Sequence, residues 1–192
     1  NNLGLSYYML DRCSDAMAAF ASSIRLKSDS YVSLVYQGIC QDKASKYSDA
    51  VNSLKTAAGI EPNNPLAHSQ LGLTYYGGKN YVESERSLRR AVQLKPDDYF
   101  YRYRLGLALY EQERYGEAMT EAKESIRLKS DYSYAHGLYG DTLYGAKQYK
   151  EAVVEYRESL RLKPGDASVH YQLGQSYYGL KDWASASVAF RE

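Results

Sequence analysis

Residues 71–76 read Leu-Gly-Leu-Thr-Tyr-Tyr, and a related stretch, Leu-Gly-Gln-Ser-Tyr-Tyr, occupies residues 173–178. The two stretches lie three steps of 34 residues apart. Tyr81 and Trp183 hold the same place in the two copies, as do Leu88 and Phe190. Agreement at a fixed distance indicates an internal repeat.

The whole chain repeats with this period of 34 residues, without an insertion. Four series of equivalent residues carry the repeat: a glycine, a small residue, an aromatic residue and a closing proline. The glycines are Gly4, Gly38, Gly72, Gly106, Gly140 and Gly174, and the small residues are Ala16, Ala50, Ser84, Ala118, Ala152 and Ala186. The aromatic residues are Tyr47, Tyr81, Tyr115, Tyr149 and Trp183, with Cys13 in the same phase. The closing residues are Pro62, Pro96 and Pro164, with Ser28 and Ser130 in place of proline.

Each unit is predicted to form two helices of roughly 13 residues joined by a short polar turn. In the third unit, Leu71 and Tyr75 lie one helical turn apart, and Gly77-Gly78 interrupts the pattern. A second apolar stripe follows and stops at Pro96. Small residues in the glycine and alanine series would let the two helix backbones approach closely. One helix pair cannot bury both of its faces, so neighbouring pairs must stack.

The order Leu-Gly-x-x-Tyr, Ala, an aromatic residue or Leu, and Pro, at this spacing, resembles the tetratricopeptide repeat (TPR). The clearest copy runs from Leu71 through Tyr81, Leu88 and Ala91 to Pro96, and the resemblance covers the whole chain. It implies an all-α fold, a right-handed α-solenoid of stacked antiparallel helix pairs. The chain departs from the usual pattern at Gln41, Ser84 and Ala122, and at His68, Arg102, His136 and His170, where a large residue often opens the first helix.

We expect residues 1–192 to form a single TPR array of about five and a half repeats. The expected units are near 1–30, 31–64, 65–98, 99–132, 133–166 and 167–192. The register enters the first helix late and stops inside the second helix of the sixth unit, with Val188 and Phe190 lacking a polar capping helix. The sequence therefore predicts a fragment of a longer protein.

Composition and charge exclude several classes of protein. Lys and Arg number 24 against 23 Asp and Glu, so the chain lacks the basic excess typical of nucleic-acid binding. The sequence contains no apolar run of membrane-spanning length and no visible signal peptide, so direct membrane insertion is not expected. Cys13 and Cys40 are too few for a disulfide framework and favour a reducing, cytoplasmic location.

No catalytic residue, metal site or cofactor is predicted. His68, His136 and His170 occupy the same place in their repeats, one repeat or more apart, and are interpreted as polar packing residues. A metal site needs three or four ligands that converge on one point. Cys13 and Cys40 are interpreted as small buried apolar residues, and no set of nucleophile, base and oxyanion donors is present. The chain is therefore expected not to be an enzyme.

In TPR proteins the first helices line a concave groove that binds peptides or partner helices, and this resemblance implies a specific lining here. The predicted partner-binding residues are Tyr8, Tyr76, Phe100, Tyr103, Arg104, Leu107, Tyr110, Tyr134, Asp141, Tyr144, Tyr171, Gln175 and Tyr178. Tyr supplies a large contact area at low rotamer entropy together with a hydroxyl group, which suits a protein-binding surface. Each of these tyrosines is equally well explained as a binding residue or as packing of the repeat.

The same resemblance argues against capture of a carboxylate. Chaperone-binding TPR proteins hold a C-terminal carboxylate with Lys and Asn or Arg, and a lone Arg lacks the convergent donors for this. The corresponding positions are Asn1, Leu5, Val35, Ile39, Ser69 and Leu73, with Arg104 the only partial match. Some TPR transferases carry an Asn ladder, but its place is taken by Asn2, Tyr36, Gln70, Arg104, Leu138 and Gln172.

Two functions follow. The first is a non-catalytic protein–protein interaction scaffold, or adaptor, that binds a peptide or partner helix in the aromatic groove. The alternative is a targeting or substrate-recruiting arm of a larger enzyme whose catalytic domain lies outside this chain. Self-association through the uncapped ends is a further mode that the sequence leaves open.

The repeat register also divides the 22 tyrosines. Those at repeat-core positions are Tyr7, Tyr47, Tyr75, Tyr81, Tyr115, Tyr139, Tyr149, Tyr156 and Tyr177. Those assigned to the groove are Tyr8, Tyr76, Tyr103, Tyr110, Tyr134, Tyr144, Tyr171 and Tyr178. Tyr31, Tyr36, Tyr99, Tyr101 and Tyr132 fit neither set.

Overall fold

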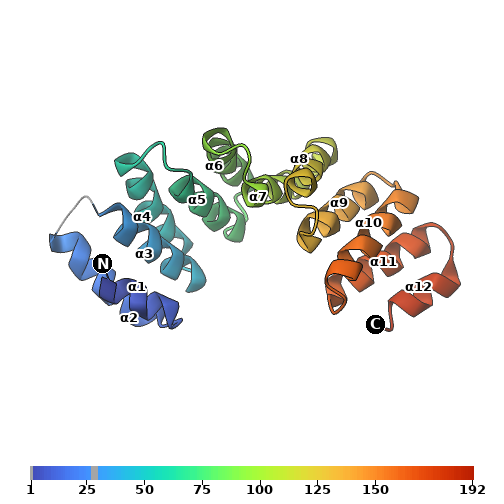
Figure 1. Cartoon of the computed structure of the whole chain (residues 1–192), viewed down its shortest axis with the longest axis horizontal. Coiled ribbons are helices and arrows are strands. Elements are labelled where there is room, and N and C mark those ends of the chain that lie inside the picture. Colours follow the sequence, from blue (N-terminus) through green and yellow to red (C-terminus); the bar gives the residue numbers. More distant parts are fainter. Residues whose placement is uncertain (1, 27–29) are drawn as a thin grey trace. The chain divides into compact units, whose positions relative to one another are not determined.

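The computed structural model describes residues 2–26 and 30–192, and these residues form twelve α-helices in two compact units, 1–96 and 97–192 (Figure 1). Asn1 and Ser28, which the sequence analysis names, lie outside the described residues. The first unit contains α1 (Asn2–Met9), α2 (Cys13–Leu26), α3 (Tyr31–Lys43), α4 (Tyr47–Ile60), α5 (Pro65–Gly77) and α6 (Tyr81–Leu94). The second unit contains α7 (Tyr99–Tyr110), α8 (Tyr115–Leu128), α9 (Ser133–Gly145), α10 (Tyr149–Leu162), α11 (Ala167–Gly179) and α12 (Trp183–Ala189).

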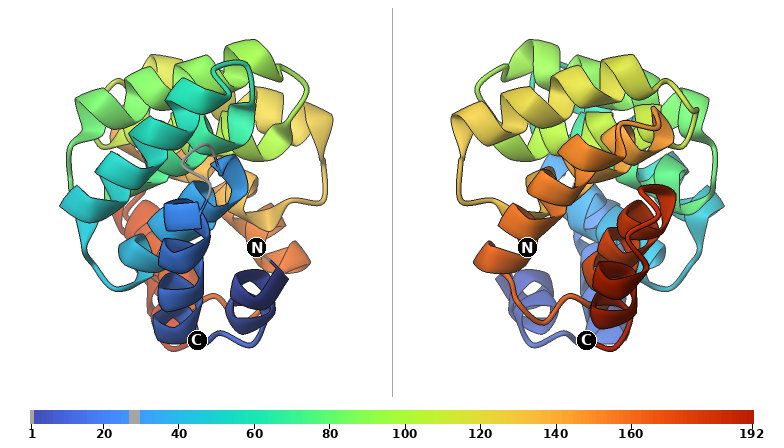
Figure 2. Two further views of the ribbon diagram at one scale, coloured as in Figure 1. Left: turned by 90° about the vertical axis from the view of Figure 1, so that its left-hand side faces the viewer. Right: turned by 90° about the vertical axis from the view of Figure 1, so that its right-hand side faces the viewer.

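The helices are arranged as successive packed pairs, which confirms the predicted helix-pair repeat fold. Within each unit every helix packs against the next one, and the first helices of neighbouring pairs also touch, as α3 does α5 and α7 does α9. Figure 2 shows this packing inside each unit: α1 to α4, in blue and cyan, follow one another as neighbours in the first, as do α9 to α12, from yellow-orange to red, in the second. Each unit thus buries the apolar faces that a single pair would leave exposed.

The turn inside each pair has the same conformation in all six copies. Two residues after the end of the first helix, or three in the fourth pair, one residue has a positive φ of 55–62°: Asp11, Ser45, Lys79, Glu113, Lys147 and Lys181. In the fifth pair the Lys147 N–H donates to the Tyr144 carbonyl and the Gln148 N–H to the Leu143 carbonyl, both at 2.8 Å. These two bonds form a Schellman motif, which satisfies carbonyl groups at the helix end. The six residues are not glycine, so each turn carries the strain of a left-handed side-chain-bearing residue.

The glycine series makes room for a large side chain of the second helix. A Cβ on Gly140 would lie 2.6 Å from the Tyr156 ring, and one on Gly72 would lie 2.5 Å from Leu88 Cγ. The same arrangement recurs at Gly4 with Phe20, Gly38 with Leu54 and Gly174 with Phe190. The fourth pair differs because the equivalent residue is the small Ala122, and Gly106 instead faces Leu138 of the next pair. The departure at Ala122 therefore changes local packing without changing the fold.

The second series also lies at helix contacts. Ala16, Ala50, Ala118 and Ala152 are fully buried, as is Ser84, which donates a 2.7 Å hydrogen bond from its hydroxyl to the Gly72 carbonyl. Around these close contacts the second unit collects a core that includes Leu143, Tyr156, Leu173 and Tyr177. The first unit has a core that includes Val35, Leu54 and Leu71. Both predicted small-residue series thus mark the places where helices approach most closely.

Candidate partner-binding face

The three histidines share one structural role. His68 Nε2 lies 3.0 Å from the Pro62 carbonyl oxygen, His136 Nε2 3.1 Å from that of Ser130, and His170 Nε2 2.9 Å from that of Pro164. Each histidine is therefore hydrogen-bonded to the carbonyl six residues earlier, which ties the first helix of its repeat to the loop that precedes it. Among the described residues, no group of three or more His, Cys, Asp or Glu side chains is placed to hold a metal ion.

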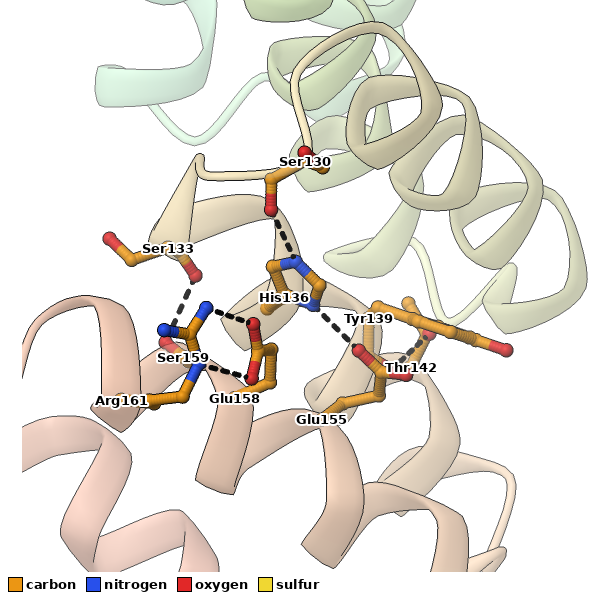
Figure 3. A network of polar contacts seen from close by, with 9 residues as sticks. All are labelled: Ser130, Ser133, His136, Tyr139, Thr142, Glu155, Glu158, Ser159 and Arg161. Atoms are coloured by element: carbon orange, nitrogen blue, oxygen red, sulfur yellow. Dashed lines mark hydrogen bonds and ion pairs between the residues drawn. The ribbon is translucent and has the colours of Figure 1, made fainter.

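His136 differs from the other two because it also meets a carboxylate (Figure 3). Its Nδ1 lies 2.8 Å from Glu155 Oε2 on α10, and this bond, with the Ser130 carbonyl, raises the pKa of His136. A carbonyl and an ionised carboxylate can only accept, so a doubly protonated imidazolium satisfies both contacts. One repeat earlier, Arg102 and Glu121 hold the same two positions and form an ion pair at 3.0 Å. The position that opens the first helix thus carries a cation–carboxylate link in two successive repeats.

The two cysteines lie at the contact between α2 and α3. Cys40 is fully buried and Cys13 partly buried, and both thiols are free. Burial and a hydrogen bond with Cys13 raise the pKa of Cys40 to about 12. A thiol with so high a pKa is a poor nucleophile, because the thiolate is the reactive form.

The predicted binding residues divide between the two units. Tyr8 and Tyr76 belong to the first unit, where Tyr8 packs edge-on against Tyr36 with ring centroids 4.9 Å apart. The others lie on the first helices of the second unit, α7, α9 and α11, and we call the set that excludes Arg104 the tyrosine face. The tyrosine face comprises Phe100, Tyr103, Leu107, Tyr110, Tyr134, Asp141, Tyr144, Tyr171, Gln175 and Tyr178.

At the start of α7 and α9 the tyrosine face forms a continuous group of aromatic contacts. Tyr103 stacks on Phe100 at 6.3 Å and also lies 6.3 Å from Tyr134, so the ring contacts cross from α7 to α9. Tyr134 is 47% exposed, so this group of rings is open to solvent in part. Offset and edge-to-face ring contacts of this kind add to the stability that burial of area provides.

Tyr132 is the centre of this group, although the repeat register assigned it to neither set of tyrosines. It serves as the N-cap residue of α9, and its ring contacts Tyr99, Phe100, Tyr103 and Tyr134 at 5.0, 6.2, 5.3 and 5.5 Å. Tyr99 joins the group from the first residue of α7. The only available sequence signal was the local density of aromatic residues at 99–103 and 132–134, because neither residue belongs to a repeated series.

The tyrosines near the ends of the first helices have a shared packing role. Each contacts the aromatic residue that begins the following helix: Tyr76 with Tyr81, Tyr110 with Tyr115, Tyr144 with Tyr149 and Tyr178 with Trp183, at centroid distances of 4.9–5.7 Å. Gly145 leaves room for one of these rings, since a Cβ on it would lie 2.6 Å from the Tyr115 ring. These tyrosines therefore support the turn as well as lining the face.

Asp141 brings a charge to the middle of the tyrosine face. The Tyr156 hydroxyl of α10 donates to Asp141 Oδ1 at 2.8 Å, and Tyr156 is 1% exposed. Burial, together with the nearby Glu111 carboxylate, raises the pKa of Asp141 to about 6 even though the bond from Tyr156 lowers it. Burial and the Asp141 carboxylate together raise the pKa of both Tyr103 and Tyr110 to about 12. The carboxylate thus lies among phenol groups that come from α7 and α10.

Arg104, the only basic residue in the predicted set, is 8% exposed. Its guanidinium carbon lies 4.0 Å from the centre of the Phe100 ring, and burial lowers its pKa to about 10. Arg104 thus packs against the aromatic group through the Phe100 ring. Leu107, which lies between Tyr103 and Tyr110 along α7, is partly buried.

On α11 the tyrosine face is more open. Tyr171 and Tyr178 are 55% and 59% exposed, and the Gln175 amide donates to the Tyr171 hydroxyl at 2.8 Å. Tyr171 also contacts Phe190 at 5.6 Å. This end of the tyrosine face offers exposed rings and a polar pair to solvent.

Stacked helix pairs with an aromatic face on their first helices define a helical-repeat protein. Two family models match this chain: one described as TPR repeat covers residues 43–77 and 140–181, and one described as tetratricopeptide repeat covers residues 70–133. The chain belongs to the tetratricopeptide repeat family. No curated protein sequence matches the chain.

Solved structures of TPR proteins resemble this chain throughout most of its length. A structure from the functional characterization of Pseudomonas aeruginosa pilF has a TM-score of 0.84 at 18% identity, covering 98% of this chain and 86% of that one. Residues 41 to the end of MamA from Desulfovibrio magneticus RS-1 give a TM-score of 0.77 at 19% identity, covering 84% and 91%. YrrB, described as a TPR protein with an unusual peptide-binding site, gives 0.71 at 18% identity, covering 89% and 88%. At identities this low the likeness establishes the fold alone.

Proposed function

We propose that this chain is a non-catalytic protein–protein interaction scaffold that binds a peptide or partner helix on the tyrosine face of its second unit. The observation that carries the proposal is the aromatic group that joins α7 to α9 through Tyr103, Tyr132 and Tyr134 while leaving Tyr134 47% exposed. Aromatic side chains are enriched at interface cores, and rings held by their neighbours lose little rotamer entropy on binding.

The similar structures, the helix lengths and the charge balance also agree with this proposal. YrrB, which shares the fold, is described as having a peptide-binding site, and Cut9, another similar structure, was solved in a hetero-tetramer with Hcn1. Among the described residues, no helix is long and apolar enough to cross a membrane. The near balance of 24 basic and 23 acidic residues favours a protein partner over a nucleic acid.

Affinity capture with matched variants tests the proposal. Tyr134→Ala combined with Tyr171→Ala removes two exposed rings of the tyrosine face, while Val154→Ala removes a side chain on α10 that is 63% exposed. We expect partner recovery from cells of the source organism to fall at least about tenfold with the tyrosine variant and to stay unchanged with Val154→Ala. Circular dichroism verifies that both variants are folded. Equal recovery with all three chains would reject the tyrosine face as the binding surface.

Location and self-association stay predictions. We propose a cytoplasmic location because Cys13 and Cys40 are free thiols, which persist in a reducing compartment. Microscopy of the tagged full-length protein checks the location. Light scattering over a range of protein concentrations measures self-association.

A further inference from the structure

Asp141 and Tyr156 depart together from the repeat that surrounds them. The residues equivalent to Asp141 in the other units are Leu5, Ile39, Leu73, Leu107 and Gln175. Those equivalent to Tyr156 are Phe20, Leu54, Leu88, Ala122 and Phe190. Packing of the helix pair therefore requires neither the carboxylate nor the phenol hydroxyl, yet the fifth unit has both, joined by a 2.8 Å hydrogen bond.

The polar contact that the structure gives Asp141 is with the Tyr156 hydroxyl, which carries no charge. Of the described residues, the charged group that shifts the pKa of Asp141 is a second carboxylate, that of Glu111 at the end of α7, and no Lys, Arg or His contributes. Asp141 is partly buried, so water compensates its charge incompletely. An approaching cation would stabilise the ionised form of a carboxylate in this setting.

Some aromatic rings of the second unit lie beneath a cation, and among the described residues others do not. Lys163 lies 4.6 Å from the centre of the Tyr134 ring and Arg104 lies 4.0 Å from that of Phe100. Within the described part of the chain, no cation lies over the rings of Tyr103, Tyr110 or Tyr144. The Asp141 carboxylate contributes to the raised pKa of both Tyr103 and Tyr110. Tyr144 follows Asp141 by three residues on α9, a spacing that makes the two side chains neighbours.

We propose that Asp141 receives a lysine or arginine side chain of the segment that binds the tyrosine face, with Tyr103, Tyr110 and Tyr144 as the aromatic walls around that side chain. The inference rests on the proposed function and names the chemistry of the partner. Charge complementarity favours this occupant: an ion pair with Asp141 and contact with the ring faces are available to the same cation. An acidic segment would meet the Asp141 carboxylate with like charge, and an apolar one would bury that carboxylate without a compensating cation.

Short peptides titrated into the isotope-labelled 192-residue chain test this inference by NMR. The probe is Ac-Ala-Leu-Lys-Leu-Ala-amide, compared with the same peptide carrying arginine, norleucine or glutamate in place of lysine. We expect the lysine and arginine peptides to shift backbone amides of α9 around Asp141 and to bind about tenfold more tightly than the norleucine peptide. Asp141→Asn, which keeps an acceptor for Tyr156, should abolish this preference, whereas Asp131→Asn, an exposed matched control, should retain it.

The outcomes separate this inference from the function on which it rests. Equal binding of the norleucine and lysine peptides at the same amides would overturn the cation site and leave the tyrosine face as a binding surface. Tighter binding of the glutamate peptide, or an unchanged lysine preference in Asp141→Asn, would also overturn it. If no peptide shifts the amides of α9, the cation site is rejected, and the capture experiment with Tyr134→Ala and Tyr171→Ala decides the proposed function separately.

Discussion

Two glycines three residues apart on α9 should respond oppositely to the same substitution. A Cβ on Gly140 would lie 2.6, 2.7 and 3.0 Å from three ring atoms of Tyr156. A Cβ on Gly137 would meet only Ser159 Oγ at 3.5 Å and Val169 Cγ2 at 3.9 Å, which are ordinary contacts. Both glycines are buried in the same helix, so the pair isolates the effect of the clash.

The magnitudes follow from two opposing effects. Replacing Gly by Ala inside a helix gains about 1 kcal/mol of stability, because alanine has the higher helix propensity. Overpacking a core costs about 1–3 kcal/mol, and the Tyr156 ring, 1% exposed and bonded to Asp141, can relieve the clash only by breaking that bond at a further cost of about 1 kcal/mol. Gly137→Ala should therefore stabilise the chain by about 1 kcal/mol, and Gly140→Ala should destabilise it by about 1–3 kcal/mol.

Urea unfolding followed by far-ultraviolet circular dichroism measures both variants against the parent chain. The midpoint should rise for Gly137→Ala and fall for Gly140→Ala. If Gly140→Ala were as stable as Gly137→Ala, the tight contact of Tyr156 with α9 would be wrong, and so would the account of the whole glycine series.

Three further predictions concern ionisable groups. His136→Gln should lower the free energy of unfolding by about 1–2 kcal/mol below pH 6.5, where the imidazolium is bonded in the folded state. The difference should disappear as pH rises through the raised pKa of His136, and urea titrations on both sides of this range check it. Asp141→Asn should raise the free energy of unfolding at pH 7 by about 1–3 kcal/mol and have little effect near pH 3.5. The reason is that the Asp141 pKa is raised from 3.8 to about 6 in the folded state, so ionisation of this carboxyl group destabilises the parent chain as pH rises between these values. The same titrations with Asp131→Asn as control would contradict this if the two variants behaved alike. Iodoacetamide should modify Cys13 of the folded chain far faster than Cys40, which is fully buried and has a pKa of about 12, and mass spectrometry with and without urea measures both; equal rates without urea would be incompatible with the packing of α2 on α3.

The fold could be predicted because the repeat has no insertion. When the period stays at 34 residues, equivalent residues identify the close contacts directly, and Gly72 with Leu88 or Gly140 with Tyr156 are the contacts that the glycine series implies. The same comparison does not show how a departure is accommodated. Ala122 leaves a space beside Gly106, and only the structure reveals that Leu138 of the following pair fills it.

The candidate site was predicted less completely, because its residues depart from the repeat. Tyr132 belongs to no repeated series, yet it contacts four other rings. Tyr156 holds a core position, as the register indicates, but its hydroxyl reaches the tyrosine face and bonds to Asp141. A comparison of repeats assigns each residue one environment, whereas a long side chain such as Tyr can span two.

The six left-handed residues between first and second helices have a consequence for how such a chain can change. Each carries a strain of about 1 kcal/mol that a glycine would relieve in part, and none of the six belongs to the tyrosine face. Replacing Lys147 or Glu113 with glycine would therefore add stability without altering any residue that we assign to binding. Mutations that reshape a recognition surface usually lower stability. Glycine substitutions in the six turns could thus offset the stability lost when mutations in the recognition surface create new partners, and the protein would remain folded.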